Sequence, residues 1–275
     1  MEGLAEQIIR SQITVTGVQP KLSLDLTPGT SAGDPQRFTI VGLWGGYILK
    51  PPSQRFAELS EVEDLTMHLA TLVNIDVVPH SLIRLQSGNL AYITKRIDRT
   101  RKGKLHMEDM CQLTERLTED KYHGSYEQIA KAIDKYSIRP GLDVVNFYEQ
   151  VVFSFLTGNA DMHLKNFSLL HQPGIGPLLA PAYDMVATAV VNPADDEDMA
   201  LTLNGKKKRI KRSDFTAAFN TSKLTEKQQE NIFSKMLKAK PKWFDLIEIS
   251  FLSQDYKEAY KQIIQDRFLR LGLND

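Results

Sequence analysis

The spacing of apolar residues changes character part-way along this 275-residue chain, and this change limits its fold more than any other feature. Before residue 97, apolar and polar residues alternate in short runs that are separated by Gly, Pro, Asp and Asn, which predicts strands. The predicted strands are residues 21–26, 37–41, 46–50, 81–86 and 90–96. Residues 27–36 are rich in turn-forming residues and are predicted to form a mobile loop.

One helical pattern interrupts these strands at residues 60–74, and Ser60 with Glu63 has the pattern of a capping box at its start. After residue 105, helical spacing dominates the chain. The predicted helices there are residues 126–136, 142–159, 225–240, 242–250 and 256–272. A sheet-rich first third followed by helices predicts an α+β, two-lobed fold, with an N-lobe at 1–97 and a C-lobe at 98–275. A cleft between two such lobes is a common ligand site.

The charge and cysteine content restrict the class of protein. Positive and negative residues balance to a net charge of zero, so no overall field attracts nucleic acid or an anionic membrane. The one cysteine, Cys111, has acidic neighbours that would raise its pKa, and we interpret it as a structural thiol of a cytoplasmic protein. The longest apolar run, 178–191, is shorter than the roughly 20 residues that span a bilayer. Trp44 and Trp243 are interpreted as packing residues.

The stretch "GNADMHLKNFSLL", residues 158–170, follows the predicted helix 142–159 and crowds four polar side chains together. Asp161 and Asn166 are five residues apart, which is the spacing of kinase-type phosphotransfer sites. In such sites the Asp accepts the proton of the substrate hydroxyl, and the Asn carbonyl ligates Mg²⁺. His163 and Lys165 would then help to neutralise the phosphoryl group.

Magnesium usually needs a further carboxylate, and Asp184 follows Asn166 by 18 residues after a strand-like run. In the kinase interpretation, Asp184 is the metal-chelating Asp on the far side of a hairpin. A structural alternative stays open, because an Asp and an Asn after a helix also serve as turn and capping residues.

The segment 13–24 supplies a candidate phosphate site, since Gly17 lies between strand-like residues and lets backbone N–H groups approach a phosphate. Lys50 ends a predicted strand, and Glu63 lies in the following helix. A strand Lys paired with a helix Glu orients ATP phosphates in kinases. The alternatives are a simple hairpin turn, a surface lysine, and a Glu63 that is used only in the capping box.

Taken together, these motifs resemble a known family. "ITVTGVQPK", "YILKPP", "AYITKRIDR", "EDMCQ", "GNADMHLKNFS" and "APAYD" occur in the order seen in HipA-type serine/threonine kinases, which include toxins of type II toxin–antitoxin modules. The resemblance covers residues 10–220. It implies a protein-kinase-like (HipA-like) fold, ATP and Mg²⁺ as cofactors, and a protein Ser or Thr as phosphate acceptor.

The resemblance also implies roles for individual residues. Asp161 resembles the proton acceptor, Asn166 and Asp184 the magnesium ligands, and Lys50 the phosphate-orienting lysine. Residues 16–21 resemble the segment over the ATP phosphates, and residues 95–97 the hinge that reads adenine. The implied ATP-binding residues are Thr16, Gly17, Val18, Gln19, Lys21, Lys50, Lys95, Arg96, Ile97, His163, Lys165 and Tyr183.

Three departures from the family pattern are visible. Thr14 stands where the family often has an autophosphorylated Ser, so Thr14 and the nearby Thr16 are candidate autophosphorylation sites. Lys95 occupies a hinge position that is frequently acidic. Full-length members carry an additional N-terminal subdomain before the Gly-containing loop, and we expect a small separate protein to supply its equivalent here.

The expected partners follow from the same resemblance. They are a helix-turn-helix antitoxin and a protein substrate, either an aminoacyl-tRNA synthetase or another translation factor. The basic run 205–212 is interpreted as a solvated loop or as a contact with DNA, and the acidic run 192–200 as a loop that offsets it or as a metal site. Two other functions stay open, namely a small-molecule kinase and a non-catalytic ATP-binding component of an antitoxin–DNA repressor complex.

Overall fold

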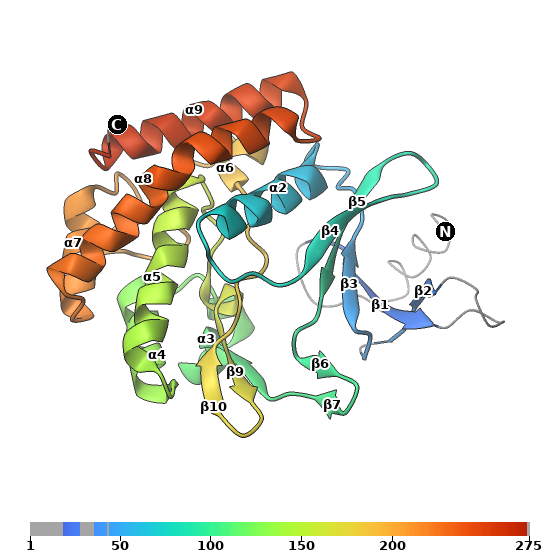
Figure 1. Cartoon of the computed structure of the whole chain (residues 1–275), viewed down its shortest axis with the longest axis horizontal. Helices are drawn as coiled ribbons and strands as arrows, with labels where there is room; N and C mark the ends of the chain where they lie inside the picture. Colours follow the sequence, from blue (N-terminus) through green and yellow to red (C-terminus); the bar gives the residue numbers. More distant parts are fainter. Residues whose placement is uncertain (1–18, 28–35, 43, 274–275) are drawn as a thin grey trace.

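The structure is a computed structural model that describes residues 19–27, 36–42 and 44–273. The predictions that lie outside these ranges concern Thr14, Thr16, Gly17, Val18 and residues 28–35 of the expected loop. The described chain forms two lobes, with a five-stranded sheet at one end and most of the helices at the other (Figure 1). The predicted α+β, two-lobed plan is therefore confirmed.

The N-lobe sheet is antiparallel, with the strand order β2-β1-β3-β5-β4. Its strands are β1 Leu22–Thr27, β2 Arg37–Ile40, β3 Tyr47–Lys50, β4 His80–Arg84 and β5 Leu90–Lys95. They follow the period-two runs of the sequence, and a small core of Leu22, Leu24 and Ile93 lies within the sheet. β3 pairs with β5, so Lys50 lies at the end of a central strand opposite Tyr92.

Helix α2, Leu59–Leu72, connects the sheet to the helical lobe. It packs on β4 and β5, and its buried apolar residues belong to the same hydrophobic core as the C-lobe helices. The buried Trp243 of the C-lobe donates its indole N–H to the Leu69 carbonyl of α2 at 3.0 Å. The helix is therefore held on two sides, which fixes the position of its Glu63.

The predicted capping box of Ser60 and Glu63 is wrong. The helix begins after Glu58, whose backbone is left-handed with φ 53°, and no side chain caps its first turn. The Glu58 carboxylate instead accepts a hydrogen bond from the Ser253 N–H at 2.8 Å. Because α2 begins at Leu59, the acidic residue of its first turn is Glu61, and Glu63 is instead buried against Lys50.

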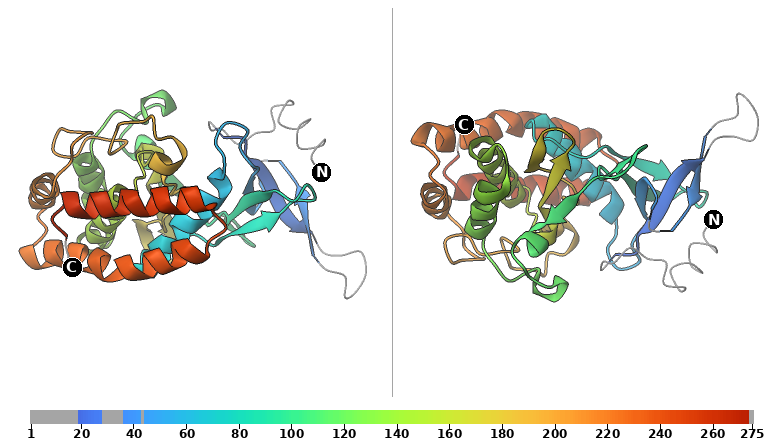
Figure 2. Two further views of the ribbon diagram at one scale, coloured as in Figure 1. Left: turned by 90° about the horizontal axis from the view of Figure 1, so that it is seen from above. Right: turned by 90° about the horizontal axis from the view of Figure 1, so that it is seen from below.

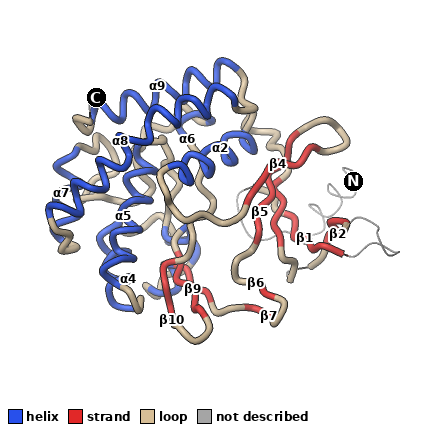
Figure 3. Tube along the Cα trace, viewed as in Figure 1, coloured by secondary structure: helices blue, strands red, loops and turns tan. Residues whose placement is uncertain are grey.

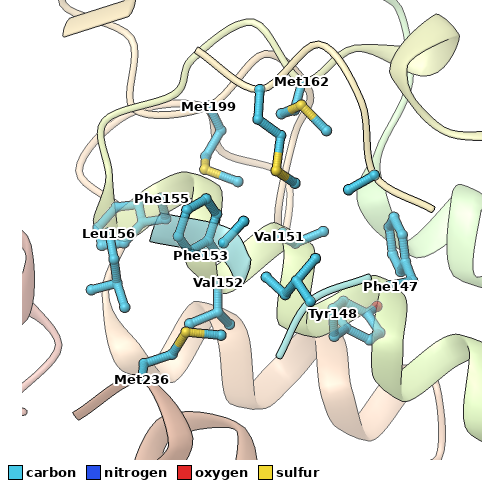
Figure 4. Close-up of a cluster of buried hydrophobic side chains, with 14 of the residues drawn as sticks. Phe147, Tyr148, Val151, Val152, Phe153, Phe155, Leu156, Met162, Met199 and Met236 are labelled. Atoms are coloured by element: carbon cyan, nitrogen blue, oxygen red, sulfur yellow. The ribbon is translucent and has the colours of Figure 1, made fainter. Parts of the chain in front are cut away.

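The C-lobe is mainly helical, as predicted. Its helices are α3 Met110–Leu113, α4 Tyr126–Tyr136, α5 Pro140–Leu156, α6 Thr188–Val191, α7 Arg212–Thr221, α8 Glu226–Ile249 and α9 Gln254–Arg270, with 3-10 turns at Thr118–Asp120 and Leu164–Asn166. α8 and α9 lie side by side and pack on α5, as two further views show (Figure 2). α5 carries much of the core, including Phe147, Val151 and Phe155, which are fully buried (Figure 4).

One expected helix boundary is absent. Residues 225–240 and 242–250 are predicted as two helices, one on each side of Pro241, yet α8 is continuous through Pro241. A proline inside a helix removes one hydrogen bond and costs about 3 kcal/mol. The buried side chains of Met236, Trp243 and Ile247 lie on both sides of the proline and hold the helix against the core.

The C-lobe also contains strands, and the sequence patterns did not predict three of them, β6, β7 and β8. β8 Met107–Asp109, β9 Ser168–Gln172 and β10 Gly176–Leu179 form a small sheet in the order β10-β9-β8, and β6 Arg99–Thr100 pairs with β7 Gly103–Lys104 (Figure 3). The hairpin of β9 and β10 was expected. β6, β7 and β8 were missed because strands of two or three residues are too short to show a period.

Two further sequence predictions have different outcomes. Trp243 packs in the core as expected, whereas Trp44 is 74% exposed, so its interpretation as a packing residue is wrong. Trp44 lies in the connection between β2 and β3, and the Arg99 guanidinium lies 5.4 Å from its ring. Cys111 is buried, and burial together with Asp109 raises the pKa of its thiol. No helix in the described ranges combines the length and apolarity needed to cross a membrane.

Candidate active site

A cleft of about 2120 Å³ lies between the two lobes. This volume exceeds the roughly 300–1000 Å³ of a typical small-molecule pocket, so it has room for a nucleotide and part of a second substrate. The described residues with a role expected from sequence that line it are Gln19, Lys21, Lys50, Glu63, Lys95, Arg96, Ile97, Asp161, His163, Lys165, Asn166, Tyr183 and Asp184. The fold therefore brings together residues that lie more than 160 positions apart.

The ammonium group of Lys50 lies between two carboxylates. Its Nζ is 2.5 Å from Oε1 of Glu63 on α2, and it also contacts Oδ1 of Asp184. Lys50 and Glu63 are only 4% and 2% exposed, so solvent screens this pair weakly. Nζ of Lys21 is 3.5 Å from Oδ2, the other carboxylate oxygen of Asp184.

These contacts set the charge of each group. Burial alone would lower the pKa of Lys50, but Asp184 and Glu63 outweigh it and hold that pKa above its ordinary value. Burial would raise the pKa of Asp184, but Lys50 and Lys21 hold it well below its usual range. Burial raises the pKa of Glu63 to about 7, although Lys50 opposes the shift. At neutral pH, Lys50 is therefore a cation and Asp184 an anion.

A short parallel bridge between the lobes positions Asp184. The Val78 N–H donates to the Ala182 carbonyl at 3.0 Å, and the Ala182 N–H donates to the Asp76 carbonyl at 2.7 Å. These bonds join the segment after α2 to the segment after β10, two residues before Asp184. Asp184 itself has a left-handed backbone with φ 59°, a conformation that Asp adopts more readily than most residues.

Hydrogen bonds fix the loop that carries Asp161 and Asn166. The Ala160 N–H donates to Oγ1 of Thr188 at 2.8 Å, and the Asp161 N–H donates to Oδ1 of Asn159 at 3.0 Å. Nδ2 of Asn166 donates to the Asp161 carbonyl at 2.9 Å. This bond uses the amide nitrogen of Asn166 and leaves its carbonyl oxygen to ligate a cation. The turn-forming side chain here is Asn159, so the Asp161 carboxylate is not needed to cap the turn.

The Asp161 carboxylate accepts a hydrogen bond from the hydroxyl of Tyr122 at 2.6 Å. Tyr122 is 37% exposed, and its ring packs edge-on against His163. Burial and the bond to Asp161 raise the pKa of the Tyr122 phenol, so it stays a donor. We did not predict this residue, because residues 114–125 show neither an apolar period nor a motif.

The other side chains expected at the ATP site differ in whether they already have a hydrogen-bond partner. The Lys165 ammonium is already paired with Oδ2 of Asp109 at 2.6 Å, so it would have to share or leave that partner to reach a phosphate. The Tyr183 hydroxyl donates to the Lys165 carbonyl at 3.0 Å and thereby supports the loop. Burial lowers the pKa of His163. Nδ1 of His163 and Nε2 of Gln19 are buried without a hydrogen-bond partner within the described ranges.

The expected hinge begins at Lys95, the last residue of β5. The Lys95 N–H donates to the Pro79 carbonyl and the Arg96 N–H to the Gly46 carbonyl, at 2.9 and 2.8 Å. The Ile97 N–H has no such partner within the described ranges. Of the three hinge residues, Ile97 is therefore the one whose backbone donor is available to a ligand in the cleft.

Comparison with known proteins places the chain in a family. Residues 13–244 match the HipA-like C-terminal domain family. The chain belongs to this family. Curated relatives include "Putative kinase Y4mE" of Sinorhizobium fredii, which is 32% identical over 64% of the chain, and a "Putative kinase" of Haemophilus influenzae, which is 30% identical over 64% of the chain. The matches cover 43% and 53% of these relatives, so the chain spans about half of their length.

Solved structures share the fold of this HipA-like chain. HipA of Shewanella oneidensis, in a complex with HipB and operator DNA, superposes with a TM-score of 0.76 at 21% identity over 97% of the chain and 70% of that protein. The proinflammatory kinase CtkA of Helicobacter pylori gives a TM-score of 0.62 at 15% identity, over 91% and 93%. The predicted kinase-like fold is therefore confirmed.

Proposed function

We propose that this HipA-like chain is an ATP- and Mg²⁺-dependent kinase that phosphorylates Ser or Thr of a protein. The observation that carries the proposal is the gathering of Asp161, Asn166, Asp184 and the pair of Lys50 and Glu63 around one cleft. The side chains of Asn166 and Asp184 suit Mg²⁺, because they offer the oxygen ligands that this ion prefers.

Each residue has a distinct task in the proposed reaction. Asp161 accepts the proton of the substrate hydroxyl as that oxygen attacks the γ-phosphorus of ATP, and ADP leaves. Lys50, held in place by Glu63, orients the phosphates, and Asn166 and Asp184 hold the metal. Bound Mg²⁺ would neutralise charge on the phosphate oxygens. Catalysis then consists mainly of positioning and electrostatic stabilisation.

Transfer of labelled phosphate tests the proposal. The purified chain, incubated with γ-labelled ATP, Mg²⁺ and a cell lysate, is expected to label a protein on Ser or Thr, and chelation of Mg²⁺ should abolish the label. If label passed only to small molecules, the chain would be a small-molecule kinase and the proposal would fail.

Removing the Tyr122 hydroxyl is expected to increase activity. This hydroxyl occupies Oδ1 of Asp161, so a substrate hydroxyl has to displace it. A hydrogen bond to a charged group contributes about 1.5–3 kcal/mol, part of which the substrate recovers, so Tyr122→Phe should raise kcat/KM about three- to tenfold. Tyr136→Phe, which removes a hydroxyl bonded to Lys135 outside the cleft, is the control. A fall in kcat for Tyr122→Phe would instead make Tyr122 a residue that positions the base.

The proposal extends to a biological role as the toxin of a toxin–antitoxin module. Membership of the HipA-like family supports it, as does the similar fold of HipA in a complex with HipB and operator DNA. We propose a helix-turn-helix antitoxin as partner and a translation factor, such as an aminoacyl-tRNA synthetase, as substrate. Expression of the active chain without its antitoxin should arrest growth, and normal growth would contradict the role.

Three of the six basic residues in the run 205–212 pair with carboxylates. Lys206 lies 2.7 Å from Asp214, and the next two lysines pair with acidic residues of the 192–200 run, Lys207 with Glu197 and Lys208 with Asp196. We therefore propose that any contact with DNA is made through the antitoxin.

This proposal predicts how the complex with the antitoxin responds to salt. Replacing Lys207 and Lys208 with Gln should leave the salt dependence of its affinity for operator DNA unchanged. Loss of two phosphate contacts would reduce the slope by about two and would assign the run to DNA binding.

A further inference from the structure

A second group of metal-ligating side chains lies one residue beyond Glu63 on α2. Asp64 and His68 are one helical turn apart, and His80 is the first residue of β4. Oδ1 of Asp64 is 2.9 Å from Nδ1 of His80, and Oδ2 is 3.5 Å from Nε2 of His68. One potential ligand atom from each of the three residues lies within 4.8 Å of the other two.

The surroundings hold two of these side chains and leave the third accessible. The side chains of His80 and Asp64 are 4% and 12% exposed, whereas His68 is 50% exposed. The His80 ring stacks on Tyr92 at 5.8 Å and meets the His68 ring at 4.5 Å. Two ligands are therefore fixed in the fold, and an ion could enter from solvent past His68.

We propose that Asp64, His68 and His80 bind a divalent transition-metal ion, with Zn²⁺ as the best match. Two imidazole nitrogens and one carboxylate form a donor set that Zn²⁺ prefers and that Mg²⁺, which favours oxygen, does not. Three protein ligands leave a fourth position for water. This site differs in chemistry from the oxygen ligands Asn166 and Asp184 of the cleft.

A bound ion would link α2, which carries Asp64 and His68, to β4, which carries His80. Because Asp64 follows Glu63 directly, the ion would also restrain the helix that holds Lys50. This consequence for catalysis rests on the proposed kinase function, whereas the binding itself does not. A purely hydrogen-bonded His–Asp–His group is the competing explanation, and a binding experiment separates the two.

Titration with Co²⁺ tests the site on the full chain after removal of metals, with excess Mg²⁺ present to occupy oxygen sites. We expect one equivalent of Co²⁺ to produce visible absorption bands typical of tetrahedral coordination, and Zn²⁺ to abolish them. Zn²⁺ should also raise Tm, because an ion that binds only the folded state stabilises it.

His68→Ala should weaken Co²⁺ binding about tenfold or more and remove the Zn²⁺-dependent rise in Tm. His68 is half exposed, so this variant should fold. His123→Ala is the matched control, because His123 also lies beside a carboxylate, Asp120 at 3.1 Å, but belongs to no three-ligand group within the described ranges. Absence of bands in the unmodified chain, or equal binding by His68→Ala, would overturn the site. Repeating the titration with Asp161→Asn separates this result from any failure of the kinase proposal.

Discussion

Asp161→Asn is expected to reduce protein phosphorylation about 10²- to 10⁴-fold, which is the range that general-base catalysis contributes. Asparagine has nearly the same shape and keeps an oxygen that can accept the Tyr122 hydroxyl, so the loop should stay in place. It cannot accept the proton of a substrate hydroxyl. The loss should therefore appear in kcat, with little change in KM for ATP or in Tm.

Asp195→Asn is a matched control for this experiment. Asp195 is an exposed carboxylate that also lines the cleft, and it accepts a hydrogen bond from the Glu197 backbone. We expect this variant to keep most of the activity. Equal activity of Asp161→Asn and the unmodified chain would remove Asp161 from the mechanism, and equal losses in both variants would point to a general effect of charge in the cleft.

Lys50→Met is expected to abolish most phosphotransfer and also to destabilise the fold. Lys50 is buried between Glu63 and Asp184, and removing one partner of a buried ion pair costs about 3 kcal/mol or more. Glu63 limits this cost, because its pKa is already raised to about 7 by burial and would rise further without Lys50. Unfolding in denaturant, measured beside labelled-phosphate transfer, reports both effects.

The double variant Lys50→Met/Glu63→Gln separates these two effects. Replacing the Glu63 carboxylate with a neutral amide removes the buried charge that has lost its partner, whereas Asp184 keeps Lys21, so part of the stability should return while activity stays lost. Lys235→Met is the control, since its ion pair with Glu149, also 2.5 Å long, is partly exposed and lies outside the cleft. That change should cost about 1 kcal/mol or less and leave activity unchanged. Full activity of Lys50→Met would contradict the proposed role of the lysine.

Much of the fold and site followed from local patterns in the sequence. The period-two runs marked all five N-lobe strands, including β2, none of whose residues is buried. The spacing of Asp161 and Asn166 is local, and the bond between the Asn166 amide and the Asp161 carbonyl explains why five residues separate them.

Features that depend on distant partners could not be predicted in this way. Glu63 fits a capping-box pattern, and only the folded position of Lys50 decides that it forms an ion pair instead. Tyr122 reaches Asp161 across 39 residues without any sequence signal. Pro241 is a reliable helix breaker locally, but the core around Trp243 outweighs its preference.

A crystal structure of the chain with Mg²⁺ and a non-hydrolysable ATP analogue tests the central claim most directly. The account predicts a metal ion about 2.0–2.1 Å from the side-chain oxygens of Asn166 and Asp184, with Lys50 on the phosphates. It also predicts the Asp161 carboxylate beside the γ-phosphate. A nucleotide bound outside this cleft, or a metal ion that touches neither Asn166 nor Asp184, would contradict it.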